Sequence, residues 1–200
     1  MPRFGSSGIR GLANVEVTPD LALQVGQVVG ELYGAAIVGR DPRTSGPMLA
    51  SALFAGILSA GSDATDAGMV STPTLARGAS EYACGVVITA SHNPAPYNGI
   101  KLWNPDGMAF DETQQAEIES ALDAARFRSV SWDKVGRLLA RDDLIPRHMD
   151  EVLRDVGTAK LKVVVDCGCG ATSTITPFLL RKMGCEVLAI HAQPDGHFPG

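Results

Sequence analysis

The 200-residue sequence has few cysteines, few aromatic residues and no long uninterrupted hydrophobic run. Four cysteines are too sparse for the disulfide framework of a small secreted protein. The most apolar stretch, residues 49–60, contains serine and glycine and is too short to span a bilayer. No hydrophobic signal region follows Arg3. We therefore expect a cytoplasmic protein without a membrane partner.

Basic side chains are scarce and scattered. The chain has 17 Lys and Arg against 22 Asp and Glu, a formal charge of -5, so a nucleic-acid partner has no electrostatic support. Cys167 and Cys169 lack the second cysteine pair or nearby histidine of a zinc site. The turn at Gly168 and Gly170 lacks the third glycine of a dinucleotide fingerprint, because Ser173 stands there. We expect neither structural zinc nor a nicotinamide or flavin.

The hydrophobic pattern predicts alternating helices and strands. With 45% hydrophobic residues the chain can bury a sizeable core. The alternation favours an α/β fold, with a layered α/β/α domain around a mixed sheet, followed by the start of a second similar α/β domain. Predicted helices cover residues 19–32, 44–60, 72–82, 111–126, 142–156 and 171–183. Predicted strands cover residues 35–38, 63–66, 85–89, 161–166 and 185–190, the fourth of them buried. We place the domain boundary so that residues 1–150 form the first domain and 151–200 begin the second.

The most informative segment is Thr-Ala-Ser-His-Asn-Pro at residues 89–94, directly after the apolar run 86–88. It places the hydroxyl of Ser91 in a loop at a strand end, where α/β proteins carry functional groups. Lys101 follows in the same turn-rich stretch, before a second strand-like segment. Ser, Asn and Pro are also ordinary turn residues, so a purely structural turn is the alternative.

The loop resembles the phosphoserine loop of the α-D-phosphohexomutases, and four other segments match that family in the same chain order. Phe-Gly-Ser-Ser-Gly-Ile-Arg-Gly, residues 4–11, resembles the family's opening loop. Three further matching segments are residues 39–43, 66–73 and 104–110. Where the second domain begins, the family commonly has asparagine at the position of Cys169, a local departure. The resemblance implies that Ser91 carries the phosphoryl group.

The resemblance also implies roles for other residues. Arg10 would approach the phosphoryl group, since its planar cation suits phosphate oxygens; a surface ion pair is the alternative. Nearby cations and partial burial would lower the pKa of Lys101, which could then exchange a proton with a sugar hydroxyl; the alternative is a solvated lysine on an edge strand. His92 would contact the substrate or orient the loop. Ser7 and Asn93 are candidate phosphate-binding residues.

The implied enzyme interconverts hexose 1-phosphate and hexose 6-phosphate, with mannose, glucose or glucosamine as the sugar, through a hexose 1,6-bisphosphate. Family members hold Mg²⁺ between the phosphoserine and three aspartates, but no Asp-x-Asp-x-Asp run occurs here. Phosphorylated Ser91 is therefore the one ligand expected within this sequence, and the others are expected beyond Gly200.

We expect the 200 residues to be the N-terminal part of a longer mutase and inactive alone, with the metal loop and domains III and IV absent. Its partners would be the phosphosugar, a second copy or the missing C-terminal domains. One half of a split mutase and a noncatalytic phosphosugar-binding or scaffold protein are the alternatives.

Overall fold

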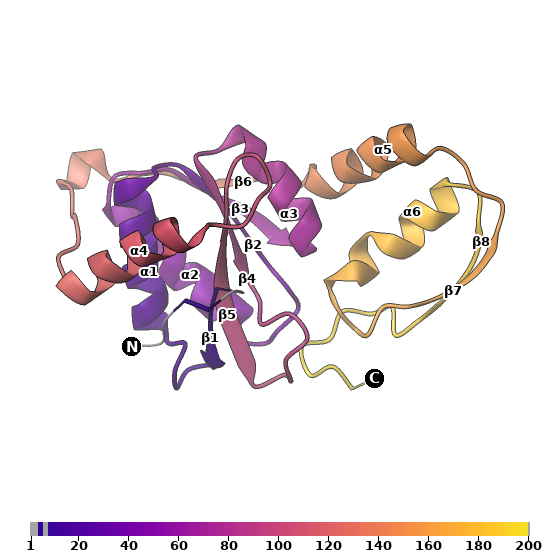
Figure 1. Ribbon diagram of the computed structural model, residues 1–200, viewed down its shortest axis with the longest axis horizontal. Coiled ribbons are helices and arrows are strands. Elements are labelled where there is room, and N and C mark those ends of the chain that lie inside the picture. The colour runs from indigo at the N-terminus through magenta and orange to yellow at the C-terminus, as the bar shows by residue number, and fades with distance from the viewer. Residues whose placement is uncertain (1–3, 6–7, 200) are drawn as a thin grey trace.

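The computed structural model describes residues 4–5 and 8–199 and places a larger α/β unit beside a smaller one (Figure 1). The helices of the described residues are α1 (Pro19–Leu32), α2 (Gly46–Ser59), α3 (Thr72–Gly78), α4 (Glu112–Ala124), α5 (Leu144–Val156) and α6 (Thr176–Lys182). The strands are β1 (Ile9–Leu12), β2 (Ala36–Arg40), β3 (Ala64–Met69), β4 (Cys84–Ile88), β5 (Tyr97–Trp103), β6 (Leu138–Ala140), β7 (Lys162–Asp166) and β8 (Glu186–Ile190). The predicted α/β class is confirmed.

The larger unit contains a six-stranded sheet in the order β1-β5-β4-β2-β3-β6. Strands β4, β2, β3 and β6 pair in parallel, whereas β5 is antiparallel to both β1 and β4. The sheet is therefore mixed, as predicted. The loops that follow β2, β3 and β4 leave the sheet at the same edge, because the carboxyl ends of parallel strands coincide.

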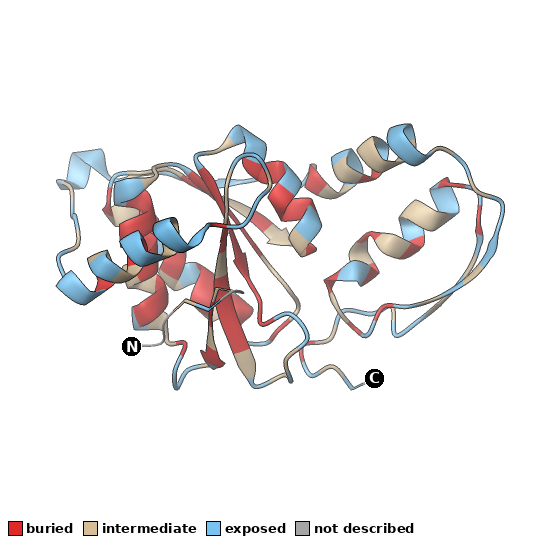
Figure 2. Cartoon of the chain, viewed as in Figure 1, coloured by how far each residue is buried: buried red, intermediate tan, exposed pale blue. Residues whose placement is uncertain are grey.

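Two hydrophobic clusters sandwich this sheet. Helices α1, α2 and α4 contribute to the larger cluster, and α3 and the start of α5 contribute to the smaller one on the opposite face. Buried residues concentrate in this layered unit (Figure 2). Helix α1 begins where the sequence predicts it, because the Thr18 Oγ1 accepts a hydrogen bond from the Leu21 N–H and Pro19 occupies the first turn.

Helices α1 and α2 pack so closely that their backbones meet at Gly26 and Gly56. A Cβ on Gly56 would collide with the Leu23 carbonyl and lie 2.8 Å from the Gln27 nitrogen. We expect Gly56→Ala to destabilise the protein by about 1–3 kcal/mol through this overpacking, although alanine is the better helix former. Urea unfolding measures the change.

The matched control is Gly46→Ala at the start of the same helix, where the nearest atom is the flexible Arg40 side chain at 3.3 Å. We expect this change to stay within about 1 kcal/mol of the wild type. A Gly56→Ala protein as stable as the wild type would contradict the close packing of the two helices.

The smaller unit differs from the sequence prediction in two ways. Strand β7 was predicted to be buried, but its residues are exposed or half-buried (Figure 2). Val164 in β7 and Leu188 in β8 are 67% and 62% exposed. The parallel pair β7 and β8 forms a sheet of two strands among the described residues, so little packs on its outer face. The predicted continuous helix is also divided into a 3-10 turn, Ala171–Thr174, and α6. Pro177 cannot donate the backbone hydrogen bond that would join them.

Strands β1 and β6 were not predicted. Residues 4–11 were assigned to a loop, but Ile9–Leu12 pairs antiparallel with β5. Strand β6 pairs in parallel with β3, and all three of its residues are exposed, so no alternation of apolar and polar residues marks it. Among the residues the structure describes, none of the helices has the length and apolar character needed to cross a bilayer.

Candidate functional site

A cleft of about 320 Å³ lies beside the Ser91 loop, between the larger and the smaller unit. The smaller unit contributes residues 170–172 and Phe198 to its wall. The larger unit contributes the loops that follow β2, β3 and β4: Asp41, Pro42, Val70, Ser71, Thr72, Pro73, Val87, Thr89, Ser91 and His92. The strand end that the sequence indicated therefore opens into a cavity.

Ser91 stands at the mouth of this cleft in an unusual backbone conformation. Its φ is 61°, in the left-handed region that non-glycine residues rarely adopt, and the residue is exposed. The Ser91 N–H donates a 2.9 Å hydrogen bond to the Thr89 Oγ1. That hydroxyl donates in turn to the Asp41 Oδ2 at 2.6 Å. The Ser91 N–H is thus held, while its exposed hydroxyl makes no hydrogen bond to a residue that the structure describes.

The buried side chain of Arg43 forms hydrogen bonds to the backbone of the same loop. It is 1% exposed and pairs with the Asp41 carboxylate at 3.0 Å. Its remaining donors reach the backbone carbonyls of Ser91, Asn93, Pro94 and Tyr97 at 2.7–3.1 Å. Sequence reasoning placed Arg43 in a matching turn and gave it no role. An arginine directly after Asp-Pro was the available signal, but its acceptors lie far along the chain.

Arg10 and Lys101 lie on the face of the sheet that borders the cleft. Arg10 pairs with Gly99, whose carbonyl accepts from the Thr89 N–H, and Lys101 lies opposite Val87. Side chains of directly paired residues point to the same face, and Val87 and Thr89 both line the cleft. Strand β5 lies between β1 and β4, so Lys101 is not on an edge strand.

The two cations lack an anionic partner within the described residues. The Arg10 Nε is buried there without a hydrogen-bond partner. Burial lowers the pKa of Lys101, and the neighbouring Arg10 charge lowers it further. A half-buried cation that no described carboxylate neutralises is suited to an anionic ligand such as a phosphoryl group.

We expect Lys101→Met to raise the melting temperature at pH 7, because the substitution removes a partly buried charge that Arg10 repels. The folded pKa of Lys101 lies below its ordinary value of 10.5, so the unfolded chain binds more protons at alkaline pH. The charge on Lys101 therefore destabilises the folded protein fully at pH values below the folded pKa. This destabilisation decreases as the pH rises towards 10.5. The difference in melting temperature between variant and wild type should shrink accordingly, as measured by calorimetry at pH 7 and pH 10.5.

Exposed Lys160 provides the control, and Lys160→Met should leave the melting temperature at pH 7 close to that of the wild type. A Lys101→Met difference that is equal at both pH values would contradict a lowered pKa at this position.

The other predicted site residues are placed differently. His92 is exposed and lines the cleft. Asn93 is half-buried, and its carbonyl accepts from Arg43 at 2.7 Å, an interaction that holds the loop. Ser7 lies outside the described residues. The structure thus brings His92 and Ser91 to the cleft, with Arg10 and Lys101 on the adjoining sheet face.

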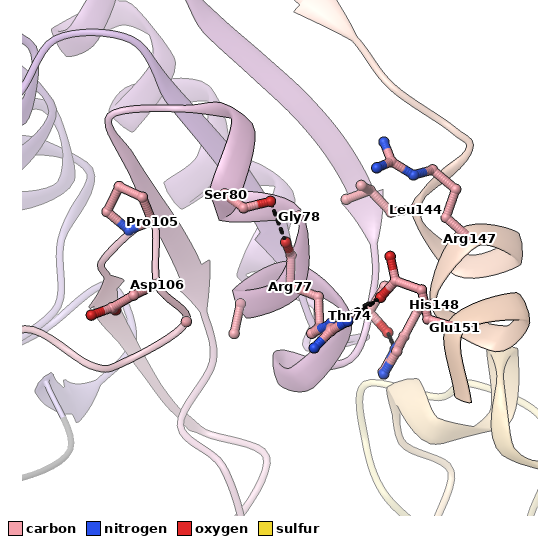
Figure 3. A pocket seen from close by; sticks show the side chains of 12 residues that line it. Thr74, Arg77, Gly78, Ser80, Pro105, Asp106, Leu144, Arg147, His148 and Glu151 are labelled. Atoms are coloured by element: carbon pink, nitrogen blue, oxygen red, sulfur yellow. Dashed lines mark hydrogen bonds and ion pairs between the residues drawn. The ribbon is translucent and has the colours of Figure 1, made fainter. Parts of the chain in front are cut away.

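A second cavity of about 280 Å³ lies between α3 and α5 (Figure 3). Its two arginines are paired within the protein: Arg77 contacts Glu151 at 2.6 Å, and Arg147 contacts Glu81 at 2.6 Å. The His148 Nδ1 lies 2.9 Å from the Thr74 Oγ1. The pKa of His148 is lowered by burial, which favours the neutral ring. Since the polar groups facing this cavity are satisfied internally, the Ser91 cleft is the stronger candidate site.

Side chains that could bind a metal ion together are not present among the described residues. Over residues 4–5 and 8–199 no group of three or more His, Cys, Asp or Glu side chains could hold a metal ion. Asp41, the carboxylate nearest to Ser91 in the hydrogen-bond network, already binds Arg43 and Thr89. The described residues alone therefore do not fit a Mg²⁺ site.

Comparison with known proteins identifies the domains around this site. Residues 1–129 match the family description "Phosphoglucomutase/phosphomannomutase, alpha/beta/alpha domain I", and residues 146–200 match domain II of the same family. A probable phosphoglucosamine mutase of Methanosarcina acetivorans is 58% identical over 199 residues, which are 100% of this chain and 46% of that protein. A phosphopentomutase of Thermococcus kodakarensis is 44% identical over 203 residues, with 100% of this chain and 45% of that protein covered.

A solved structure is also similar. The phosphoglucomutase/phosphomannomutase family protein of Burkholderia thailandensis aligns with a TM-score of 0.86 at 30% identity, covering 98% of this chain and 45% of that one. The chain thus spans about half the length of the relatives it matches. Together, the two matched domains cover most of the sequence and enclose the serine cleft, so the chain belongs to the phosphoglucomutase/phosphomannomutase family, the α-D-phosphohexomutases that its motifs resemble.

Proposed function

We propose that the full-length protein is a phosphohexomutase that carries its phosphoryl group on Ser91 and interconverts hexose 1-phosphate and hexose 6-phosphate. The observation that carries this proposal is the Arg10 guanidinium, whose buried Nε has no hydrogen-bond partner among the described residues. It lies beside Lys101 on the sheet face that leads to the exposed hydroxyl of Ser91. Phosphoryl transfer needs positive charge around the transferred group and little covalent chemistry from the protein.

In the proposed transfer step, a sugar hydroxyl oxygen forms a bond to the phosphorus of phosphorylated Ser91 while the bond from the Ser91 Oγ to phosphorus breaks. Arg10 stabilises the charge on the equatorial oxygens as a bidentate donor. Lys101, whose pKa burial lowers, takes the hydroxyl proton in its neutral form. The Lys101 ammonium then releases this proton, and the leaving Ser91 Oγ takes one up to become the serine hydroxyl again. The hexose 1,6-bisphosphate then turns over and returns its other phosphoryl group to Ser91. The net reaction moves a phosphate between C1 and C6.

We also propose Mg²⁺ as the cofactor of the longer protein and the hexose 1,6-bisphosphate as its activator. Phosphorylated Ser91 would supply one metal ligand, and acidic residues beyond this sequence would supply the others. Because the described residues do not complete such a site, no step above depends on the metal.

Glucosamine phosphate is the first substrate to test, because several relatives named probable phosphoglucosamine mutase are 43–58% identical to this chain. A pentose phosphate is the second candidate, because the Thermococcus kodakarensis relative is named a phosphopentomutase. The test compares kcat/KM of the purified full-length protein for glucosamine, mannose, glucose and ribose phosphates, each with its bisphosphate and Mg²⁺.

The proposal predicts turnover with the highest kcat/KM for a hexose phosphate. Preference for ribose phosphate would reassign the substrate to pentoses. Binding without turnover of any sugar would favour the noncatalytic alternative, and turnover only after a second polypeptide is added would favour a split mutase.

A further inference from the structure

We propose that Arg43 is the positioning residue of the phosphoserine loop and that Phe198 of the smaller unit keeps its guanidinium in place. This inference rests on the proposed function, since it assigns a role in transfer to Arg43, which does not line the cleft. Nothing in the chemistry of the reaction requires a buried arginine beneath the nucleophile, so its role must come from geometry.

All five N–H donors of the Arg43 side chain have an acceptor. The Nε donates to the Asp41 Oδ2 at 3.0 Å. The Nη1 donates to the carbonyls of Pro94 and Tyr97 at 2.7 and 2.8 Å, and the Nη2 to those of Asn93 and Ser91 at 2.7 and 3.1 Å. Five donors in a rigid planar fork are found in arginine alone. A lysine could satisfy at most three of these five acceptor contacts.

These contacts define the shape of the loop. Their acceptors lie on both sides of its tip, from Ser91 to Tyr97, so the guanidinium closes the loop around itself. Asp41 links the same network to the nucleophile a second time, because it accepts from Thr89, whose hydroxyl accepts from the Ser91 N–H. Ser91 is thus held by its carbonyl through Arg43 and by its N–H through Thr89.

The fixed backbone matters because Ser91 is strained. A serine at φ 61° is unfavourable without surrounding contacts, and such strain persists where neighbouring structure determines it. The conformation sets the direction of the Ser91 Cα–Cβ bond and therefore the position of the Oγ. Misplacement of a reacting atom by about 1 Å can reduce a rate about 10²-fold.

The smaller unit covers the side chain of Arg43. The Phe198 ring lies over the Arg43 guanidinium, with 4.9 Å from the ring centroid to Cζ. Gly196 is buried against the backbone of Pro42 and Thr44, where a Cβ would lie 2.5 Å from the Pro42 carbonyl oxygen. A ring over the face of a guanidinium leaves its edge donors free for the loop carbonyls and excludes water from them. The second unit thereby supports the geometry of the nucleophile through Arg43.

The test measures phosphorylation of Ser91 by labelled glucose 1,6-bisphosphate in the full-length protein and compares Arg43→Lys with Arg40→Lys. Arg40 is the last residue of β2, three positions before Arg43, and pairs with Asp66 at 3.4 Å. Within the described residues, its side chain makes no hydrogen bond to a carbonyl of the serine loop. We expect Arg43→Lys to slow labelling about 10²-fold with KM for the sugar phosphate little changed, and Arg40→Lys to label at the wild-type rate. Hydrogen exchange of residues 91–97 should accelerate in Arg43→Lys and stay at the wild-type rate in Arg40→Lys.

Phe198→Leu is the second variant, because it leaves every hydrogen bond of Arg43 intact. We expect slower labelling and faster hydrogen exchange in residues 91–97, both smaller than in Arg43→Lys, with the melting temperature near that of the wild type. If Arg43→Lys does not fold, this variant decides the question by itself.

The outcomes separate this inference from the proposed function. A wild-type protein that takes no label refutes the proposed function itself. If the wild type is labelled and a folded Arg43→Lys protein is labelled at the same rate, the positioning role is overturned and the proposed function stands. Where Arg43→Lys does not fold, labelling of Phe198→Leu at the wild-type rate overturns the positioning role in the same way.

Discussion

Ser91→Ala is expected to abolish mutase activity, with a loss on the order of 10⁴-fold to 10⁶-fold in kcat, the range seen when a catalytic nucleophile is removed. The same change should barely affect stability, because the Ser91 side chain is exposed and its hydroxyl makes no hydrogen bond to a described residue. Steady-state kinetics of the full-length protein and its melting temperature measure the two effects.

Ser80→Ala is a suitable control, since Ser80 is exposed and its hydroxyl bonds the Arg77 carbonyl away from the serine cleft. It should retain full activity. If Ser91→Ala were as active as the wild type, the loop would be a structural turn, and the phosphoserine mechanism would be wrong.

Arg10→Met is expected to lower kcat/KM by about 10²-fold to 10³-fold, comparable to removing one preorganised donor from a transition-state site. Stability should hold or increase, because the substitution removes a buried Nε without a partner among the described residues. The pKa of Lys101 should rise towards its ordinary value, because the Arg10 charge contributes to its lowering. Kinetics, calorimetry and NMR titration of the Lys101 ammonium report these three changes.

Arg137→Met is the matched control on the surface, where Arg137 pairs with Asp63 at 2.7 Å far from the cleft. Its activity should equal that of the wild type. If the role of Arg10 were structural, Arg10→Met would lower the stability of the protein, and the fraction that stays folded would keep the wild-type kcat/KM.

Local sequence signals predicted most elements of the larger unit. Thr18 and Pro19 mark the start of α1 because capping depends on neighbouring residues alone, and the structure confirms the cap. Strand β6 escaped prediction because its residues are exposed and carry no alternation. The burial of β7 was wrong for a related reason: an apolar run such as residues 163–165 predicts a strand, but what covers its faces is decided by distant parts of the chain.

In the candidate site, too, the residues of a local motif could be predicted from the sequence, whereas a residue with distant partners could not. The serine loop is a contiguous motif, so the sequence could indicate Ser91, His92 and Lys101. Arg43 could not be identified in this way, because its carbonyl acceptors lie 48 to 54 residues further along the chain. Its role appears only when β2 and β4 are paired side by side and their loops meet. The roles of the site residues and the domain boundary at residue 150 stay predictions.

The most direct test of the phosphoserine account is to incubate the full-length protein with isotopically labelled hexose 1,6-bisphosphate and Mg²⁺ and to map the labelled peptide. The account predicts one phosphoryl group on Ser91 and loss of that label to added hexose monophosphate. A complete, folded protein that takes up no label, or carries it on a residue other than Ser91, would contradict it.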